Sequence, residues 1–397
     1  MTTNRFCSAI DVVAYKKSNA VKNKREHMKN RKWNRIVLKV GSALIAPERK
    51  GCSSRYLLHI AKFILQCRDM GTEVILVSSG SVAAGAHFFN GIEKPSLAIK
   101  KAMAAAGQNE MMAAWDRFFD FPSAQILLTH GDFQDRERYD SVRETIFALL
   151  EHNVLPVVNE NDVVTTDALK VGDNDNLSAM VAAAADADAL IICSDIDGLY
   201  DKNPHTHDDA TLIKNVSAID QSIYDMAGGA HSSVGTGGMQ TKIEAAEKAT
   251  SHGLTTYIIN GFKEHSFEQL IQGNNPGTIF SPYPKPMEDN LHWMTHTAKA
   301  QGEVVIEDGF DYPLDENCDQ LTSSEIVEVH GEFSAGDTIL VRSDDGKHIA
   351  KAEANYGSCL LNFITQHEAE DETEFQHHTG PLISDKNIAV LDHEAPK

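Results

Sequence analysis

The feature that most restricts the fold is a repeated order of short apolar segments, most of them followed directly by glycine, serine or asparagine. These segments lie at 35–40, 74–77, 123–128, 154–158 and 189–193. Segments with the spacing of helices separate them, at 56–70, 97–119, 139–151 and 177–185. Apolar strands that alternate with helices are typical of parallel sheets buried on both faces. The order therefore predicts a three-layer α/β sandwich with a mainly parallel central sheet.

The C-terminal part has a different pattern. A helix at 242–252 and a strand at 256–259 are followed by prolines at 282, 284 and 286, which mark a linker. Short strands with turn residues between them are then expected at 303–306, 325–329, 337–341 and 388–391. We therefore expect one α/β domain over 34–285, a linker over 286–301 and a small β-rich domain over 302–397.

Composition places the chain among globular proteins, with 42% hydrophobic and 23% charged residues. The longest apolar stretch, 179–193, is interrupted by Asp186 and Asp188, so no membrane span is predicted. The six cysteines show no paired spacing, which argues against a disulfide framework or a zinc site. This pattern favours a reducing compartment, and we expect a cytoplasmic protein.

Charge is distributed unevenly along the chain. Residues 1–33 carry nine Lys or Arg and two acidic residues, without the apolar segment of a secretory signal. We expect a flexible basic extension there, with a transit peptide or a start at Met28 as alternatives. Residues 303–397 carry five basic and 22 acidic residues. Such an acidic domain would repel a phosphate backbone, so RNA binding is disfavoured.

Two polar clusters lie beside apolar segments, one before the apolar run 179–185 and one after the strand at 154–158. Residues 170–178 place two aspartates and two asparagines in one turn, and Asn159–Asp162 directly follow the strand at 154–158. One such residue would suffice to cap a helix, and a simple turn with a cap is the alternative interpretation. In open α/β sheets, ligands bind beyond the carboxyl ends of strands. The clusters therefore indicate a pocket for a polar, charged small molecule.

Glycine- and serine-rich loops indicate phosphate binding, because their backbone N–H groups can approach phosphates closely. They lie at 41–42, 78–81 and 235–242, and lysines stand beside two of them at Lys39 and Lys242. Neither a Walker A motif nor a Gly-x-Gly-x-x-Gly motif after the first strand is present, which disfavours P-loop NTPases and Rossmann dehydrogenases. Taken singly, Lys39 could be a lysine that extends to solvent, and Asp175 only a cap.

Taken together, these segments resemble the glutamate 5-kinase family of the amino acid kinase superfamily. The segments that carry the resemblance keep one order, Ile36–Ser42, Val77–Gly85, Val158–Asp162, Val171–Ala179, Ser194–Tyr200 and Gly235–Lys242. The C-terminal domain is similar, more loosely, to the PUA domain of many bacterial members. Ser194 and Ser78 stand where the family usually has threonine; the hydroxyl is kept, so we expect a small effect.

The resemblance implies ATP-dependent phosphorylation of the γ-carboxylate of L-glutamate to L-glutamyl 5-phosphate, the first step of proline biosynthesis. A carboxylate with a pKa near ~4.3 is already ionised at neutral pH, so no general base is needed. Positioning and positive charge supply most of the catalysis in phosphoryl transfer. The resemblance also implies ATP with Mg²⁺, feedback inhibition by proline, and a homo-oligomer, either a dimer or a tetramer.

The same resemblance assigns roles to residues. Lys39 and Lys242 would stabilise the transferring phosphoryl group, and Asp175 would orient both lysines. Glutamate binding is expected at Ser79, Asn159, Asp162, Asp173 and Asn174. ATP binding is expected at Lys39, Gly41, Ser42, Ser194, Asp195, Thr236, Gly237, Gly238, Met239, Gln240, Thr241 and Lys242. No set of metal ligands is assigned to the chain itself.

Two other functions stay open on sequence grounds. The chain could be a different amino acid kinase that acts on N-acetylglutamate, carbamate or UMP, although the clusters at 159–162 and 173–176 favour glutamate. It could also bind RNA through the PUA-like domain, against which the acidic composition of that domain counts.

Overall fold

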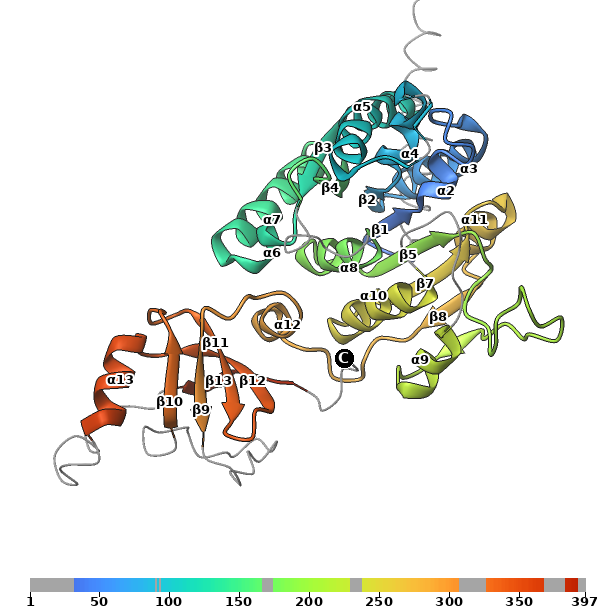
Figure 1. Ribbon diagram of the computed structural model, residues 1–397. Helices are drawn as coiled ribbons and strands as arrows, with labels where there is room; N and C mark the ends of the chain where they lie inside the picture. The colour runs from blue at the N-terminus through green and yellow to red at the C-terminus, as the bar shows by residue number, and fades with distance from the viewer. Residues whose placement is uncertain are drawn as a thin grey trace, which may run out of the picture. The chain divides into compact units, whose positions relative to one another are not determined.

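A computed structural model describes residues 32–89, 91–92, 94–165, 174–228, 238–306, 326–367 and 383–391 of the 397-residue chain. The described residues form two compact units (Figure 1). The first comprises residues up to 132 together with 140–286, and the second comprises 133–139 together with residues from 287 onward. Segment 133–139 thus belongs to the second unit, although it lies within the range expected for the α/β domain.

The first unit is built on a sheet whose described strands follow the order β3-β4-β2-β1-β5-β7-β8-β6. These strands are β1 (Arg35–Val40), β2 (Glu73–Ser78), β3 (Ser123–Leu128), β4 (Leu155–Glu160), β5 (Ala189–Ser194), β6 (Asn215–Val216), β7 (Thr255–Asn260) and β8 (Thr278–Phe280). Within this described sheet β7 and β8 pair antiparallel, and the other pairs are parallel. The prediction of a mainly parallel central sheet is confirmed.

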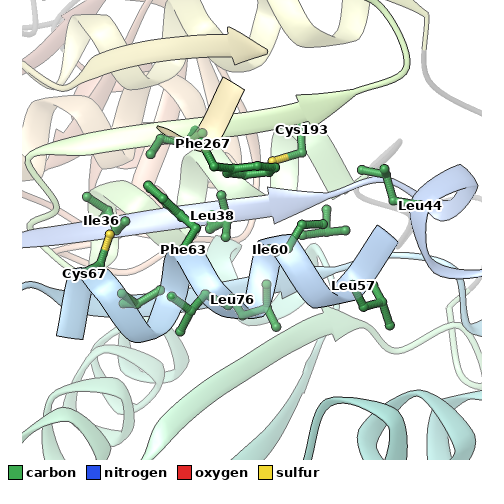
Figure 2. Close-up of a cluster of buried hydrophobic side chains, with 14 of the residues drawn as sticks. Ile36, Leu38, Leu44, Leu57, Ile60, Phe63, Cys67, Leu76, Cys193 and Phe267 are labelled. Carbon is green, nitrogen blue, oxygen red and sulfur yellow. The ribbon is translucent and has the colours of Figure 1, made fainter. Parts of the chain in front are cut away.

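Helices cover both faces of this sheet because successive side chains of a strand point to opposite sides. Leu38 of β1 packs against Phe63 of α3 (Ser54–Asp69) and Phe267 of α11 (Glu264–Ile271) in one buried cluster (Figure 2). The opposite face is covered by α8 (Asn174–Ala184) and α10 (Met239–Ser251). Lys39 follows Leu38, so its side chain is directed to the face that α8 covers.

The remaining helices of this part of the chain connect its strands in sequence. They are α2 (Ser42–Ile45), α4 (Ser81–Gly85), the 3₁₀ helix η1 (Ala86–Phe89), α5 (Leu97–Asp116), α6 (Gly131–Gln134), α7 (Arg136–Glu151) and α9 (Gln221–Ala227). Helix α8 starts at Asn174, three residues before the helical segment expected from the apolar pattern. The apolar pattern did not include these residues because the first turn of the helix is polar. Helix α5 passes through Gly107 without a break. Because Gly107 has no side chain, α5 can lie close to the backbone of α4 at this position.

The second unit contains a smaller sheet whose described strands follow the order β10-β9-β11-β12-β13. They are β9 (Gly302–Ile306), β10 (Ile326–Gly331), β11 (Thr338–Ser343), β12 (His348–Ala354) and β13 (Ile383–Val390), with helices α12 (Asp289–His296) and α13 (Ser358–His367). Helix α12 lies in the range expected to be a linker. Strand β12 was not expected from the sequence, because its buried face consists of alanines at 350, 352 and 354.

The described helices include none with the length and apolar character that a membrane crossing requires.

We expect Gly107→Ala to destabilise the first unit. A Cβ at Gly107 would lie 1.9 Å from the carbonyl oxygen of Ser81 and 2.4 Å from the amide nitrogen of Gly85. Both are backbone atoms of α4, which cannot rotate away, so the cost in free energy of unfolding should reach about 2 kcal/mol or more. Urea unfolding measures it.

Gly228→Ala is the matched control, because a Cβ there would meet no heavy atom nearer than 3.3 Å. Its free energy of unfolding should stay within about 0.5 kcal/mol of wild type. Equal stability of both variants would show that α4 and α5 are not packed as closely as described.

Candidate active site

Three charged side chains meet where β1, α8 and α10 come together. Lys242 Nζ lies 2.9 Å from Asp175 Oδ2, and Lys39 Nζ forms an ion pair with Asp175 Oδ1. Asp175 is completely buried, and Lys39 and Lys242 are only 6% and 8% exposed. We call Lys39, Asp175 and Lys242 the lysine–aspartate trio. The structure brings together the three residues to which the resemblance assigns catalysis.

Local structure explains this meeting. Asp175 lies in the first turn of α8, and Lys242 lies in the first turn of α10 after Gly238. Helix α8 carries alanine and other small side chains, so it packs closely on the sheet and against α10. The N-terminal ends of the two helices are therefore adjacent. A helix N-terminus carries partial positive charge, so this place favours anionic phosphate groups.

The lysines keep Asp175 ionised. Burial alone would raise the pKa of this carboxyl, but the charges and hydrogen bonds of Lys39 and Lys242 lower it from 3.8 to about 2. Thr241 Oγ1 adds a hydrogen bond to Asp175 Oδ2 at 3.2 Å. The trio thus contains one negative and two positive groups, and a net positive charge faces any ligand bound there.

A second group of side chains lies beside α8. Asn174 Nδ2 donates to Ser79 Oγ and to Asn159 Oδ1, each at 2.8 Å. Ser79 follows β2, Asn159 lies in β4, and Asn174 begins α8. We call Ser79, Asn159 and Asn174 the amide cluster. Three of the residues expected to bind glutamate are therefore joined through Asn174, although they come from separate segments of the sequence.

The other expected site residues are held in different ways. Asp162 accepts a hydrogen bond from Ser81 Oγ at 2.7 Å. Val40 pairs with Ser78 on one side and Cys193 on the other. Gly41 and Ser42 follow β1 and Ser79 follows β2, while Ser194 is the last residue of β5, so all four lie at the same edge of the sheet. Ser194 Oγ donates to Asp195 Oδ1 at 3.1 Å.

Not all expected residues join the trio. Met239 is buried, and the hydrogen bond found for Gln240 goes to Glu244, one turn further along α10. None of the described contacts connects Met239, Gln240, Ser194 or Asp195 to the trio. Asp173, Thr236 and Gly237 lie outside the described residues.

Sequence reasoning missed two residues that hold others in place. Ser81 holds Asp162, and Gln108 of α5 accepts a hydrogen bond from Asn159 Nδ2 at 2.9 Å. Ser81 stood in a segment that carried the resemblance, but no role was given to it. Gln108 is followed by Asn109 and Glu110 in α5, and its spacing gave no signal of a site.

We expect Asp175→Asn to destabilise the protein strongly near neutral pH, because two buried ammonium groups would lose their counter-charge. The loss in free energy of unfolding should be about 3–5 kcal/mol. The folded pKa of Asp175 lies below its unfolded value, so the stabilisation from the carboxylate is present above the unfolded pKa. It is lost as the pH falls through the folded pKa.

The difference between wild type and Asp175→Asn should therefore narrow in acid. From about pH 5 downward, the gap in free energy of unfolding should decrease by about 2 kcal/mol in total. Urea unfolding of both proteins at a series of pH values measures this gap. A gap that stays constant with pH would show that Asp175 is not a buried carboxylate held by the two lysines.

Comparisons with known proteins show the family to which the chain belongs. Residues 34–260 match the model of the amino acid kinase family, and residues 302–371 match that of the PUA domain. The curated Glutamate 5-kinase 1 of Pseudoalteromonas translucida is 67% identical, covering 91% of this chain and 98% of its own. The Glutamate 5-kinase of Idiomarina loihiensis is 56% identical, covering 87% and 94%. The chain therefore belongs to the amino acid kinase family and, within it, to the glutamate 5-kinase family.

Proposed function

We propose that this chain transfers the γ-phosphoryl group of ATP to the γ-carboxylate of L-glutamate, the first step of proline biosynthesis. One carboxylate oxygen forms a bond to phosphorus, the bond between phosphorus and the β,γ-bridging oxygen breaks, and L-glutamyl 5-phosphate and ADP result. The observation that carries the proposal is the buried lysine–aspartate trio at two adjacent helix N-termini, beside the amide cluster.

The trio addresses the main difficulty of this reaction. The attacking carboxylate has a pKa near ~4.3 and is anionic at neutral pH, so it needs no base, but it must approach another anion. Lys39 and Lys242 would offset this repulsion and stabilise charge on the transferring group. Their effect is larger than in water because the site is buried.

Asp175 has a positioning role in the proposal. Without a carboxylate between them, two buried ammonium groups would repel each other. The carboxylate contacts one lysine through each oxygen, which holds both near the same point. Preorganised charges of this kind need not move during the reaction.

The amide cluster and Asp162 would bind glutamate. The carboxylate of Asp162 suits the α-ammonium group, and Ser81 fixes it in place. Ser79 Oγ accepts a hydrogen bond from Asn174, so its own hydrogen can be donated to a substrate carboxylate. Asp173, expected to take part as well, belongs to the same proposal.

ATP would lie over the loops that follow β1 and β5 and over the N-terminus of α10. Gly41, Ser42, Ser194, Asp195 and residues 236–242 are assigned to it by resemblance. Mg²⁺ would enter with the nucleotide, where it neutralises phosphate charge. Because both oxygens of Asp175 contact lysines, this carboxylate suits the role of orienting the lysines better than that of binding the metal.

Further parts of the proposal rest on the resemblance. Proline would inhibit the enzyme at or overlapping the glutamate pocket, and the chain would work as a homo-oligomer, a dimer or a tetramer. The kinase chemistry is assigned to residues 34–285, and the PUA-like domain over 302–397 receives no role in it. A cytoplasmic location is inferred from the spacing of the cysteines.

The proposal is tested by trapping acyl phosphate with hydroxylamine. With Mg-ATP, we expect hydroxamate from L-glutamate and none from N-acetyl-L-glutamate or L-aspartate, and no ADP release with UMP. Proline should suppress the signal, and glutamate should overcome the suppression. Lys242→Ala should lower kcat by at least about 100-fold, because a charge that stabilises the transition state is lost.

Lys62→Ala is the matched control, since Lys62 lies on the surface of α3 in an exposed ion pair with Glu264. It should keep the wild-type rate. Hydroxamate from another acceptor would overturn the substrate assignment but keep the roles of the lysines. An equal decrease of kcat in Lys242→Ala and Lys62→Ala would contradict those roles.

A further inference from the structure

We infer that Gln108 of α5 is a positioning residue for L-glutamate. It holds the amide of Asn159 in the orientation that leaves the side-chain oxygen of Asn174 to accept a hydrogen bond from the α-ammonium group of the substrate. The inference rests on the proposed function and deepens it, because it names a determinant of substrate choice that lies outside the site residues already assigned.

Gln108 connects the amide cluster to the next layer of the protein. Its Oε1 accepts from Asn159 Nδ2 at 2.9 Å, and its Nε2 donates to Gln125 Oε1 at 3.1 Å. Gln108 is 8% exposed and Asn159 only 1% exposed. A buried amide that loses a hydrogen-bond partner cannot form a replacement hydrogen bond with water. The loss is therefore costly, and the amide keeps the orientation that satisfies its partners.

A backbone group fixes the direction of this chain of hydrogen bonds. The N–H of Glu160 donates to Asn159 Oδ1 at 2.9 Å, and a backbone N–H can only donate. The side-chain oxygen of Asn159 must therefore lie on that side, and its nitrogen must face Gln108. Gln108 in turn must present its oxygen, and its hydrogen bond to Gln125 stabilises that choice.

The orientation of Asn159 determines that of Asn174. Asn174 meets the oxygen of Asn159, so it must present its nitrogen, and that nitrogen donates both to Asn159 and to Ser79. Its Oδ1 is buried and accepts no hydrogen bond from any described residue. An unpaired buried acceptor is unfavourable, and a donor on a bound molecule would relieve the cost.

Glutamate carries such a donor at one place only. Its two carboxylates are ionised and can only accept, whereas its α-ammonium group offers three hydrogens. The amide of Asn174 therefore suits the ammonium group through its oxygen, instead of donating to a substrate carboxylate. A dicarboxylate without an amino group, such as glutarate, would leave this oxygen unpaired, and the site would discriminate against it.

The experiment compares three variants of the full chain. Gln108→Leu removes the acceptor for Asn159 Nδ2, and Gln108→Glu keeps an oxygen there. Met103→Leu is the control, because Met103 is a buried residue of the same helix and a change of similar volume leaves the polar chain intact. For each we measure kcat, the KM for L-glutamate, the KM for ATP, and inhibition by glutarate. Circular dichroism verifies folding.

We expect Gln108→Leu to raise the KM for glutamate at least about tenfold, while kcat, the KM for ATP and the Ki of glutarate change less than about twofold. Gln108→Glu should recover most of the affinity for glutamate, and Met103→Leu should behave as wild type. If Gln108→Leu does not fold, Gln108→Met replaces it, because methionine has a similar shape and no acceptor at this place. The inference then predicts a higher KM for glutamate in Gln108→Met than in Gln108→Glu.

Two results would overturn the inference. One is an unchanged KM for glutamate in the variants without an acceptor at 108. The other is an equal rise of the KM for glutamate and the Ki of glutarate, which would indicate general distortion of the pocket. Both differ from a failure of the proposed function, in which the wild type itself would form no hydroxamate from glutamate.

Discussion

The carboxylate of Asp175, buried between two lysines, is the interaction on which the site depends. A buried ammonium group is costly unless it is paired, and here one carboxylate serves two of them. The pairing requires β1 to turn Lys39 toward α8, and α8 and α10 to bring their first turns together. Close packing of small side chains in α8 makes this approach possible. The fold of the first unit thus holds these charges in a buried position.

Much of the first unit could be predicted from the sequence because its strands are continuous apolar runs bounded by polar turns. Where the prediction differed from the structure, the sequence pattern was weak or was compatible with two kinds of local structure. Gly107 gave no signal of its role within the helical segment 97–119, yet its missing Cβ allows α5 to lie against α4. In the second unit, β12 buries only alanines, a residue type that does not distinguish a strand from a helix. Helix α12 directly follows a stretch with three prolines, which indicated a linker.

The site was predictable to a different degree. Lys39, Asp175 and Lys242 could be assigned because their segments resemble a known family, whereas their spacing alone permitted a surface lysine and a simple cap. Gln108 could not be found from the sequence, since its role depends on three hydrogen bonds across α5, β3 and β4. Residues whose function is to orient others give no pattern of their own, because the contacts that define them form only in the fold.

A double-mutant cycle on Lys39→Gln and Lys242→Gln tests the central claim most directly. The quantity to measure is kcat/KM for L-glutamate in wild type, both single variants and the double variant. If one carboxylate holds both lysines on one phosphoryl group, the double variant should lose little more than the worse single variant, because each lysine depends on the other. Losses that multiply would show that the two lysines act independently, which would contradict the account.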